Sequence, residues 1–341
     1  MNKRFFYIDF IKTLSIFLVF VLHIEGSFVD FWQGNPIYLS IGNIFQALSI
    51  IAVPLFVISS GFLAFNKKIE NNTIFILKKV LPLIFVWLSW GVIRFFWEIL
   101  VFGKNFHNFS ELGQLVGLSV LSRFWFMPMI VGLFMSIPIF YPIVNKARKD
   151  VQIYFLVLWF LAFSVTESIK NLSGIELVPN LNSSVLLMFI PYIGFFLFGG
   201  FVRKNTNMLK LKTSSFKMVL FIFFSSLLFS LFLNDYSYLS INVVVQSFSG
   251  FIVLIRLFEL LDNKFVTLSS LLVSRFTLEL YLVQRFIIEL LSLTDGFEKL
   301  ASYFPLFLLP ILSIIVFMLG LGTIYFISLI PMVNKLLLRN K

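Results

Sequence analysis

Three ionisable side chains near the N-terminus have a spacing that fits one face of a helix. Lys12 and His23 are eleven residues apart, which at about 100° per residue is about 20° beyond three full turns. Asp9 lies about 40° from the same face. Because each helical residue adds about 1.5 Å, Lys12 and His23 would be about 16 Å apart along the axis. A helix here therefore predicts a stripe that joins a cation near one end to an imidazole near the other.

The chemistry that this stripe can support depends on His23. A neutral imidazole accepts a proton from a hydroxyl near pH 7, which few other side chains do without a large change in pKa. The second histidine, His107, falls in a predicted external loop. Glu25 either orients the imidazole or faces water. The spacing alone fits a structural interpretation equally well, in which Asp9 pairs with Lys12 and the histidine is interfacial.

The composition places this stripe in a membrane. Of the 341 residues, 59% are hydrophobic and 13% are charged, whereas soluble domains carry roughly 25% charged residues. The 47 phenylalanines exceed what one water-soluble core uses. Cysteine is absent and histidine occurs twice, which excludes disulfides and leaves little material for a metal site, so no metal is expected. The net charge of +11 indicates basic cytoplasmic loops rather than a nucleic-acid partner.

Ten apolar segments are long enough to cross about 30 Å of hydrocarbon as helices. They fall at about 5–24, 43–65, 76–100, 125–144, 153–169, 185–202, 217–233, 241–260, 270–291 and 305–331. The first is longer than the apolar region of a signal peptide and lacks a following cleavage site, so we expect it to be retained. The loops are short. The sequence therefore predicts an all-α polytopic bundle of about ten transmembrane helices, with residues 1–341 as a single domain.

The distribution of Lys and Arg predicts the orientation of these helices. With the N-terminus inside, eighteen Lys and Arg residues fall in cytoplasmic segments and four in external loops. One missed helix would invert every later loop and remove this bias. We therefore expect both termini to be cytoplasmic, in a multi-pass protein of the cell membrane.

Ionisable residues inside a bilayer are costly, so each is a candidate for function. Arg94 and Glu98 form an i,i+4 pair near the outer end of the third span, which favours a structural ion pair. Glu167 lies at the outer end of the fifth span, and Arg256 lies toward the inner end of the eighth. The ninth span is the most polar, and we expect it to be central in the bundle. Its polar side chains are Arg275, Glu279, Tyr281, Gln284, Arg285 and Glu289.

Five short motifs follow one another along the chain. They are Tyr7-Ile-Asp9-Phe-Ile-Lys12 with His23, Val53-Pro54-Leu-Phe56 with Ser60-Gly61-Phe62-Leu63, Lys78-Lys79-Val-Leu-Pro82, Arg123-Phe-Trp125-Phe126-Met-Pro128, and Thr277-Leu-Glu279-Leu-Tyr281-Leu-Val-Gln284. In this order, and over nearly the whole chain, they resemble the family 3 membrane acyltransferases. Two positions depart from the family pattern. Lys12 replaces an arginine, which keeps the charge and loses the bidentate fork, and Gln284 replaces a second histidine, so that position cannot transfer a proton.

The resemblance implies an enzyme that moves an acyl group, often acetyl, from cytoplasmic acyl-CoA to a hydroxyl of an extracytoplasmic glycan or lipid-linked sugar. By this resemblance His23 would be the general base, with Lys12 and Asp9 beside the donor path. The residues expected to contact the acceptor are Trp125, Phe126, Arg94, Glu98, Glu167, Tyr281 and Gln284.

The donor would bind through its phosphates. Acyl-CoA carries several phosphate charges, which cations at the cytoplasmic mouth would attract. Arg203 and the lysines before the third span are available there, although most loop lysines fit ordinary positive-inside charge. Arg256 and Arg275 lie deeper, and with Glu279 they are the expected contacts. Acyl-CoA enters as a substrate, and no permanently bound cofactor is expected.

Two other classes of function stay open. A glycan or lipid-linked sugar transporter without acyl-transfer chemistry predicts a wide polar cavity and tolerance of changes at His23. The enzyme predicts a narrow donor tunnel and dependence on His23. A sensory or structural membrane subunit explains the intramembrane charges poorly.

Overall fold

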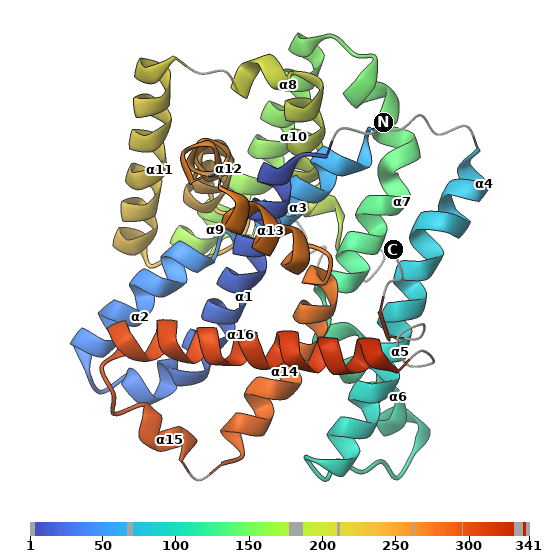
Figure 1. Ribbon diagram of the computed structural model, residues 1–341, viewed down its shortest axis with the longest axis vertical. Coiled ribbons are helices and arrows are strands. Elements are labelled where there is room, and N and C mark those ends of the chain that lie inside the picture. Colours follow the sequence, from blue (N-terminus) through green and yellow to red (C-terminus); the bar gives the residue numbers. More distant parts are fainter. Residues whose placement is uncertain are drawn as a thin grey trace.

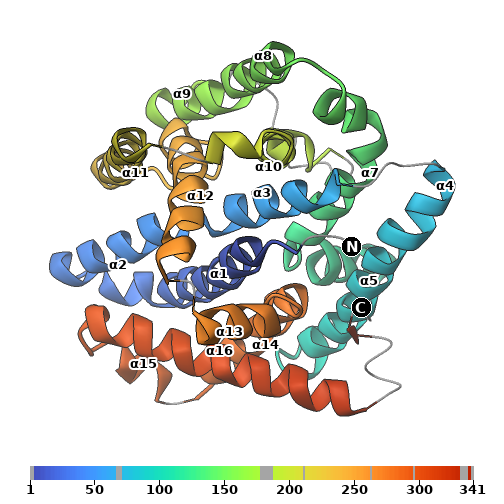
Figure 2. The same ribbon diagram turned by 45° about the horizontal axis from the view of Figure 1, so that its top comes forward.

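The protein is a bundle of helices, and no strand occurs in the part of the chain that the structure describes. The computed structural model describes residues 4–66, 71–176, 187–209, 212–261, 263–294, 296–330 and 337–338. Figures 1 and 2 show helices of the N-terminal, middle and C-terminal thirds of the chain packed side by side. The expected all-α membrane architecture is confirmed.

Eight helices among the described residues are long and apolar enough to cross a membrane, and a bent pair gives up to nine spans. The eight are α1 (Phe6–Trp32), α2 with α3 (Pro36–Ser49 and Ala52–Ala64), α4 with α5 (Asn72–Phe75 and Leu81–Leu100), α7 (Phe126–Asn145), α8 with α9 (Lys149–Trp159 and Thr166–Ser173), α11 (Thr213–Leu233), α12 (Ile241–Leu261) and α16 (Pro305–Leu329). The bent pair is α13 (Lys264–Val273) and α14 (Thr277–Ser292), which meet at 71°.

The expected sixth span, 185–202, accounts for the difference between the nine possible spans and the ten that the sequence predicts. Residues 177–186 lie outside the described part of the chain. Beyond them a short 3-10 turn leads into α10 (Ile193–Lys204), which has 12 residues. A helix of that length covers about 18 Å, less than the hydrocarbon thickness. The first and last residues of the chain also lie outside the described part, so the orientation of the termini stays a prediction.

Two glycines bring the backbones of α3 and α10 into contact. A Cβ atom on Gly61 would overlap the carbonyl oxygen of Phe196, and one on Gly199 would overlap that of Ile58. Small residues at such crossings are typical of membrane helix pairs, because they allow close approach. The crossing also holds the C-terminal ends of both helices side by side, where Arg203 of α10 donates a 3.0 Å hydrogen bond to Oδ1 of Asn66.

The helix α1 lies in the middle of the bundle, with α3 and α10 to one side and α14 and α16 to the other (Figure 2). Ile11, Phe20 and Phe28 of α1 are fully buried. The first half of α14 is largely buried as well, including Glu279 and Gln284. This arrangement agrees with the expectation that the polar ninth segment is central.

The bend before α14 brings a backbone carbonyl to α1. The α13 helix ends at Val273 and α14 begins at Thr277. Lys12 Nζ donates to the carbonyl oxygen of Ser274 at 3.3 Å, and Thr13 Oγ1 donates to that of Ser270 at 3.2 Å. Side chains of α1 therefore satisfy carbonyl groups around the break, as irregular backbone at membrane depth requires.

Candidate functional site

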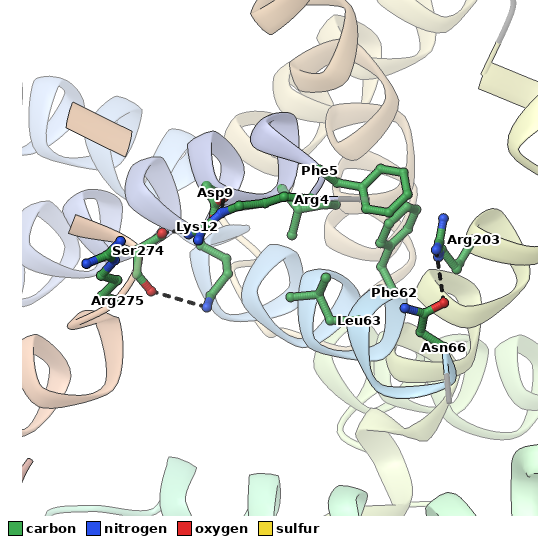
Figure 3. Close-up of a pocket in the computed structure, with 11 residues that line it drawn as sticks. Arg4, Phe5, Asp9, Lys12, Phe62, Leu63, Asn66, Arg203, Ser274 and Arg275 are labelled. Atoms are coloured by element: carbon green, nitrogen blue, oxygen red, sulfur yellow. Dashed lines mark hydrogen bonds and ion pairs between the residues drawn. The ribbon is translucent and has the colours of Figure 1, made fainter. Parts of the chain in front are cut away.

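A cavity of about 580 Å³ lies at the N-terminal end of α1 (Figure 3). Its walls come from α1, from the C-terminal ends of α3 and α10, and from the bend between α13 and α14. We call it the Arg203 cavity. Its charged side chains are Arg4, Asp9, Lys12, Arg203 and Arg275. With four cations and one carboxylate, this cavity is suited to an anion.

Asp9 organises one wall of the Arg203 cavity. Its side chain is 13% exposed. It accepts hydrogen bonds from Arg4 Nε at 2.9 Å and from Ser274 Oγ at 2.7 Å. Asp9 thereby connects α1 to the bend before α14 and holds Arg4 and Ser274 beside the cavity, as Figure 3 shows.

Arg203 forms the opposite wall. Its guanidinium lies 4.1 Å from the centroid of the Phe5 ring and 5.4 Å from that of Phe62. These cation–π contacts and the hydrogen bond to Asn66 fix the direction of the guanidinium. A planar cation held in this way binds phosphate groups with defined geometry.

Two of the residues expected to bind the donor lie elsewhere. Arg256 is half exposed, pairs with Glu259 one turn along α12, and lines a small pocket with Leu209 and Phe216. Glu279 is buried one turn beyond Arg275 in α14. The structure therefore brings Arg275 together with Arg4, Lys12 and Arg203, rather than with Arg256.

A second cavity, of about 230 Å³, contains His23, and we call it the His23 cavity. One wall is α1 and the other is the second half of α14. The lining residues are Leu22, His23, Gly26, Ser27, Arg285, Ile288, Glu289 and Ser292. The imidazole lies within interaction distance of the Gln284 side chain, and its Nδ1 is buried without a hydrogen-bond partner. An unpartnered ring nitrogen beside a cavity can accept a proton from a bound hydroxyl.

Arg94 and Glu98 belong to a buried ion network beside the His23 cavity. Arg94 is fully buried and bonds Glu98 on its own helix and Glu289 on α14. Trp97 Nε1 also donates to Glu289, at 3.0 Å. Through Glu289, which lines the cavity, the network supports one wall of the site. The i,i+4 pair expected from the sequence is present, and its link to α14 is new.

Aromatic side chains connect the two cavities. Lys12 Nζ lies 5.7 Å from the Phe56 ring centroid. Phe56 contacts Phe126 at 5.5 Å, and Phe126 contacts Tyr281 at 5.2 Å. The carbonyl of Tyr281 accepts a 3.3 Å hydrogen bond from Gln284, which faces His23. We call Phe56, Phe126 and Tyr281 the aromatic layer.

Trp125 lies beside the aromatic layer, with its ring centroid 6.0 Å from that of Tyr192 and 5.6 Å from that of Tyr238. Burial raises the pKa of Tyr238, so this phenol stays protonated and keeps a hydrogen-bond donor. Of the motif expected to contact the acceptor, Phe126 is buried between α3 and α14 and Trp125 is half-buried. Neither residue lines the His23 cavity.

Two carboxylates near the same end of the bundle lie outside the His23 cavity. Glu167 accepts a 2.7 Å hydrogen bond from Ser237 Oγ, in the connection between α11 and α12. Glu25 is buried against Gly42 of α2. It follows His23 by two residues, which corresponds to about 200° around α1. Glu25 therefore faces neither water nor the imidazole. Groups of three or more His, Asp or Glu that could hold a metal do not occur in the described part of the chain.

Sequence reasoning missed Arg4, Asn66 and Ser274 in the Arg203 cavity. Arg4 precedes the predicted first span, and Asn66 and Ser274 are ordinary polar residues at helix ends. No pattern in the sequence distinguishes them, because their role depends on which helix ends meet in space.

Comparison with known proteins identifies the family. No curated protein and no solved structure matches the chain. A family model described as an acyltransferase domain matches residues 5–331, which is nearly the whole chain and includes every residue that lines the two cavities except Arg4. The resemblance that the motifs indicated is thereby confirmed, and the chain belongs to the acyltransferase 3 family.

Proposed function

We propose that this protein transfers an acyl group, acetyl in the simplest case, from acyl-CoA to a hydroxyl of a glycan or lipid-linked sugar at the surface of the cell membrane. The observation that carries the proposal is the placement of Lys12 and His23. Both lie on one face of α1, about 16 Å apart along the helix, and they line two different cavities. One cavity is rich in cations and the other contains an imidazole.

The donor enters the Arg203 cavity from the cytoplasm in this proposal. Arg4, Arg203 and Arg275 bind the phosphates of acyl-CoA, and Lys12 lies deeper on the way to the aromatic layer. The pantetheine arm then follows the aromatic layer toward Gln284 and His23, because its thioester must reach the imidazole. Arg4 and Arg275 are exposed at this cavity, whereas Lys12 and Arg203 are half-buried. The two half-buried cations are less well hydrated than loop lysines in water, so they attract a phosphate more strongly.

His23 provides the acid–base chemistry. Its unprotonated nitrogen takes the proton of the acceptor hydroxyl while the hydroxyl oxygen forms a bond to the thioester carbon. The carbon–sulfur bond then breaks, and the thiolate of CoA receives the proton from the imidazolium. The Gln284 amide orients the ring and takes no proton. Binding donor and acceptor from opposite sides at one imidazole supplies acceleration through proximity.

Transport without chemistry fits the structure less well. The residues lining the Arg203 cavity and those lining the His23 cavity do not overlap, and the aromatic layer lies between them. A transporter needs a path wide enough for a sugar, whereas an acyl chain on a thin pantetheine arm needs a narrow one.

The test is an acyl-transfer measurement with purified protein in lipid nanodiscs. The chain contains no cysteine, so CoA thiol released from acetyl-CoA can be followed with a thiol reagent without background from the protein. We expect thiol release that depends on added surface glycan, and acetyl groups on that glycan in cells that express the protein. Unchanged glycan acylation in cells with and without the protein, together with no thiol release, would reject the proposal.

A further inference from the structure

The ion network beside the His23 cavity contains more cations than carboxylates. Four cations belong to it, namely Arg94, Lys104, Arg123 and Arg285, and two carboxylates, Glu98 and Glu289, are their partners among the described residues. The network thus carries an excess of two positive charges beside a cavity.

Arg94 occupies most of the carboxylate oxygens. It is fully buried, and its Nε and Nη2 donate to Glu98 Oε1 at 2.9 and 2.5 Å. Its Nη1 and Nη2 also donate to Glu289 Oε2 and Oε1 at 2.6 and 2.9 Å. Lys104 Nζ takes the remaining oxygen of Glu98, at 2.9 Å. The buried guanidinium is therefore the charge that these two carboxylates neutralise.

Arg285 interacts more weakly with these carboxylates than Arg94 does. Its Nε is 3.6 Å from Glu289 Oε1, beyond an ordinary hydrogen bond, and that oxygen already accepts from Arg94. Arg123 Nε is 3.4 Å from Glu98 and makes no hydrogen bond. Arg285 also has Arg123 and Arg94 as like-charged neighbours. Its side chain is 37% exposed and lines the His23 cavity.

We propose that the acceptor bound in this cavity is an anionic saccharide, and that Arg285 binds its phosphate or carboxylate group. This inference rests on the proposed function and specifies its acceptor. A guanidinium that is surrounded by like charges is stabilised by a mobile oxyanion, which it can bind through two parallel hydrogen bonds. Arg285 and His23 line the same small cavity, so a bound oxyanion fixes the neighbouring hydroxyl of the sugar near the imidazole.

The size of the cavity agrees with one charged sugar unit. Its volume of about 230 Å³ lies below the roughly 300–1,000 Å³ that is usual for ligand pockets. A single sugar ring enters while the rest of a glycan stays outside. Arg285 is then the positioning residue, and His23 is the group that moves the proton.

Binding of small sugars to the full-length protein in phosphatidylcholine nanodiscs tests the inference. The probes are glucose 1-phosphate, glucuronate and methyl glucoside, which present a phosphate, a carboxylate and no charge. We expect the wild type to bind one of the two anionic sugars at least about tenfold more tightly than methyl glucoside, the scale of a charge-assisted hydrogen bond. We expect Arg285→Gln to lose this preference and Arg285→Lys to keep part of it. Arg148→Gln should keep it fully, because Arg148 is an exposed arginine at the start of α8 and pairs with Asp150 in the first turn of that helix.

Salt dependence and lipid composition separate the alternatives. In wild type the preference should fall as salt rises, which tests the idea even if Arg285→Gln does not fold. Equal binding of all three sugars, binding of none, or a preference that survives in a folded Arg285→Gln variant would overturn the proposal. If phosphatidylglycerol nanodiscs stabilise the wild type through Arg285 while the anionic sugars do not bind, the anion is a lipid headgroup and the saccharide proposal is wrong.

Acyl transfer to the same sugars tests the anion site and the acyltransferase function separately. Preferential binding of an anionic sugar without release of CoA thiol would support the anion site and reject the acyltransferase function. Acetyl transfer with equal kcat/KM to neutral and anionic acceptors would support the acyltransferase function and reject the anion site.

Discussion

Arg94 of α5 and Glu289 of α14 are joined by two hydrogen bonds of 2.6 and 2.9 Å across 195 residues of sequence. The i,i+4 partner of Arg94, Glu98, could be read from spacing, whereas this second partner depends on the tertiary fold. The pair connects the helix that follows the bend with a helix from the first third of the chain. It therefore fixes the wall of the His23 cavity that carries Arg285 and Glu289.

Removing Arg94 should destabilise the fold. Because Arg94 is fully buried, Arg94→Met leaves Glu98 and Glu289 without their main counter-ion, at a cost of about 3–5 kcal/mol. We expect a clear fall of the melting temperature in detergent, and partial recovery in the double variant Arg94→Met/Glu289→Gln. Arg148→Gln is the exposed control and should leave the melting temperature unchanged. An Arg94→Met protein as stable as the wild type would show that the network contributes little.

Substitution of His23 should remove catalysis without removing donor binding. His23→Gln keeps a hydrogen-bonding side chain and cannot accept the proton. We expect a folded protein that binds acyl-CoA and releases CoA thiol about 10²-fold more slowly, or slower still. Gln284 does not compensate, for the same chemical reason. Near-normal glycan acylation by a well-expressed His23→Gln strain would exclude His23 as the base.

Donor binding should depend on the Arg203 cavity and be independent of Arg256. The double variant Arg203→Gln/Arg275→Gln removes two of the four cations there, and we expect labelled acyl-CoA to bind at least about tenfold more weakly. Arg256→Gln is the matched control, because Arg256 pairs with Glu259 in a separate pocket. If Arg256→Gln weakens binding as much as the double variant does, the donor does not use this cavity as proposed.

The glycine contact between α3 and α10 should be intolerant of a methyl group. Gly61→Ala places a Cβ on the backbone of Phe196, and backbone cannot rotate away as a side chain can. We expect loss of folded, monodisperse protein in detergent. Gly322→Ala in α16, where a Cβ meets no atom within 4 Å, should be neutral or slightly stabilising, because alanine favours helix. Similar yields and melting temperatures for the two variants would contradict the packing argument.

Reporter fusions should place both ends of the chain in the cytoplasm. A cytoplasmic reporter after Lys341 should be active, and an external reporter inserted at Asn35, between α1 and α2, should be active as well. The bias of Lys and Arg toward alternate loops motivates both expectations. An external C-terminus would require an odd number of spans, such as the nine that the bent pair allows, and would contradict the expected orientation.

The sequence was sufficient for features that repeat along one helix. The 3.6-residue period placed Lys12 and His23 on one face of α1, and low charge with long apolar runs predicted the membrane class. The polar composition of the segment that holds Gln284 predicted its central position. Each of these depends on one stretch of chain and on general physical rules.

Features that depend on contacts between distant segments could not be predicted. The bend at Ser274 has no proline or glycine near it, so sequence rules indicate a continuous helix. Arg256 and Arg275 are both deep cations in sequence terms, and only the packing of α12 against other helices separates them. The shortness of α10 also depends on a contact with a distant segment. Its apolar side chains are buried against α3, so they do not need lipid on all sides.

The aromatic layer has a consequence for the electrical properties of the membrane. A cell that stores energy as an ion gradient cannot tolerate an open aqueous pore, yet the proposed reaction requires an acyl group to pass from one face to the other. Phe56, Phe126 and the Tyr281 ring offer an ion no ligands comparable to water, so the cost of dehydration opposes its passage. A thioester on a flexible arm carries no net charge, so its dehydration costs far less than that of an ion. In the proposed reaction, the same three rings that admit the acyl group would therefore oppose the leakage of ions across the membrane.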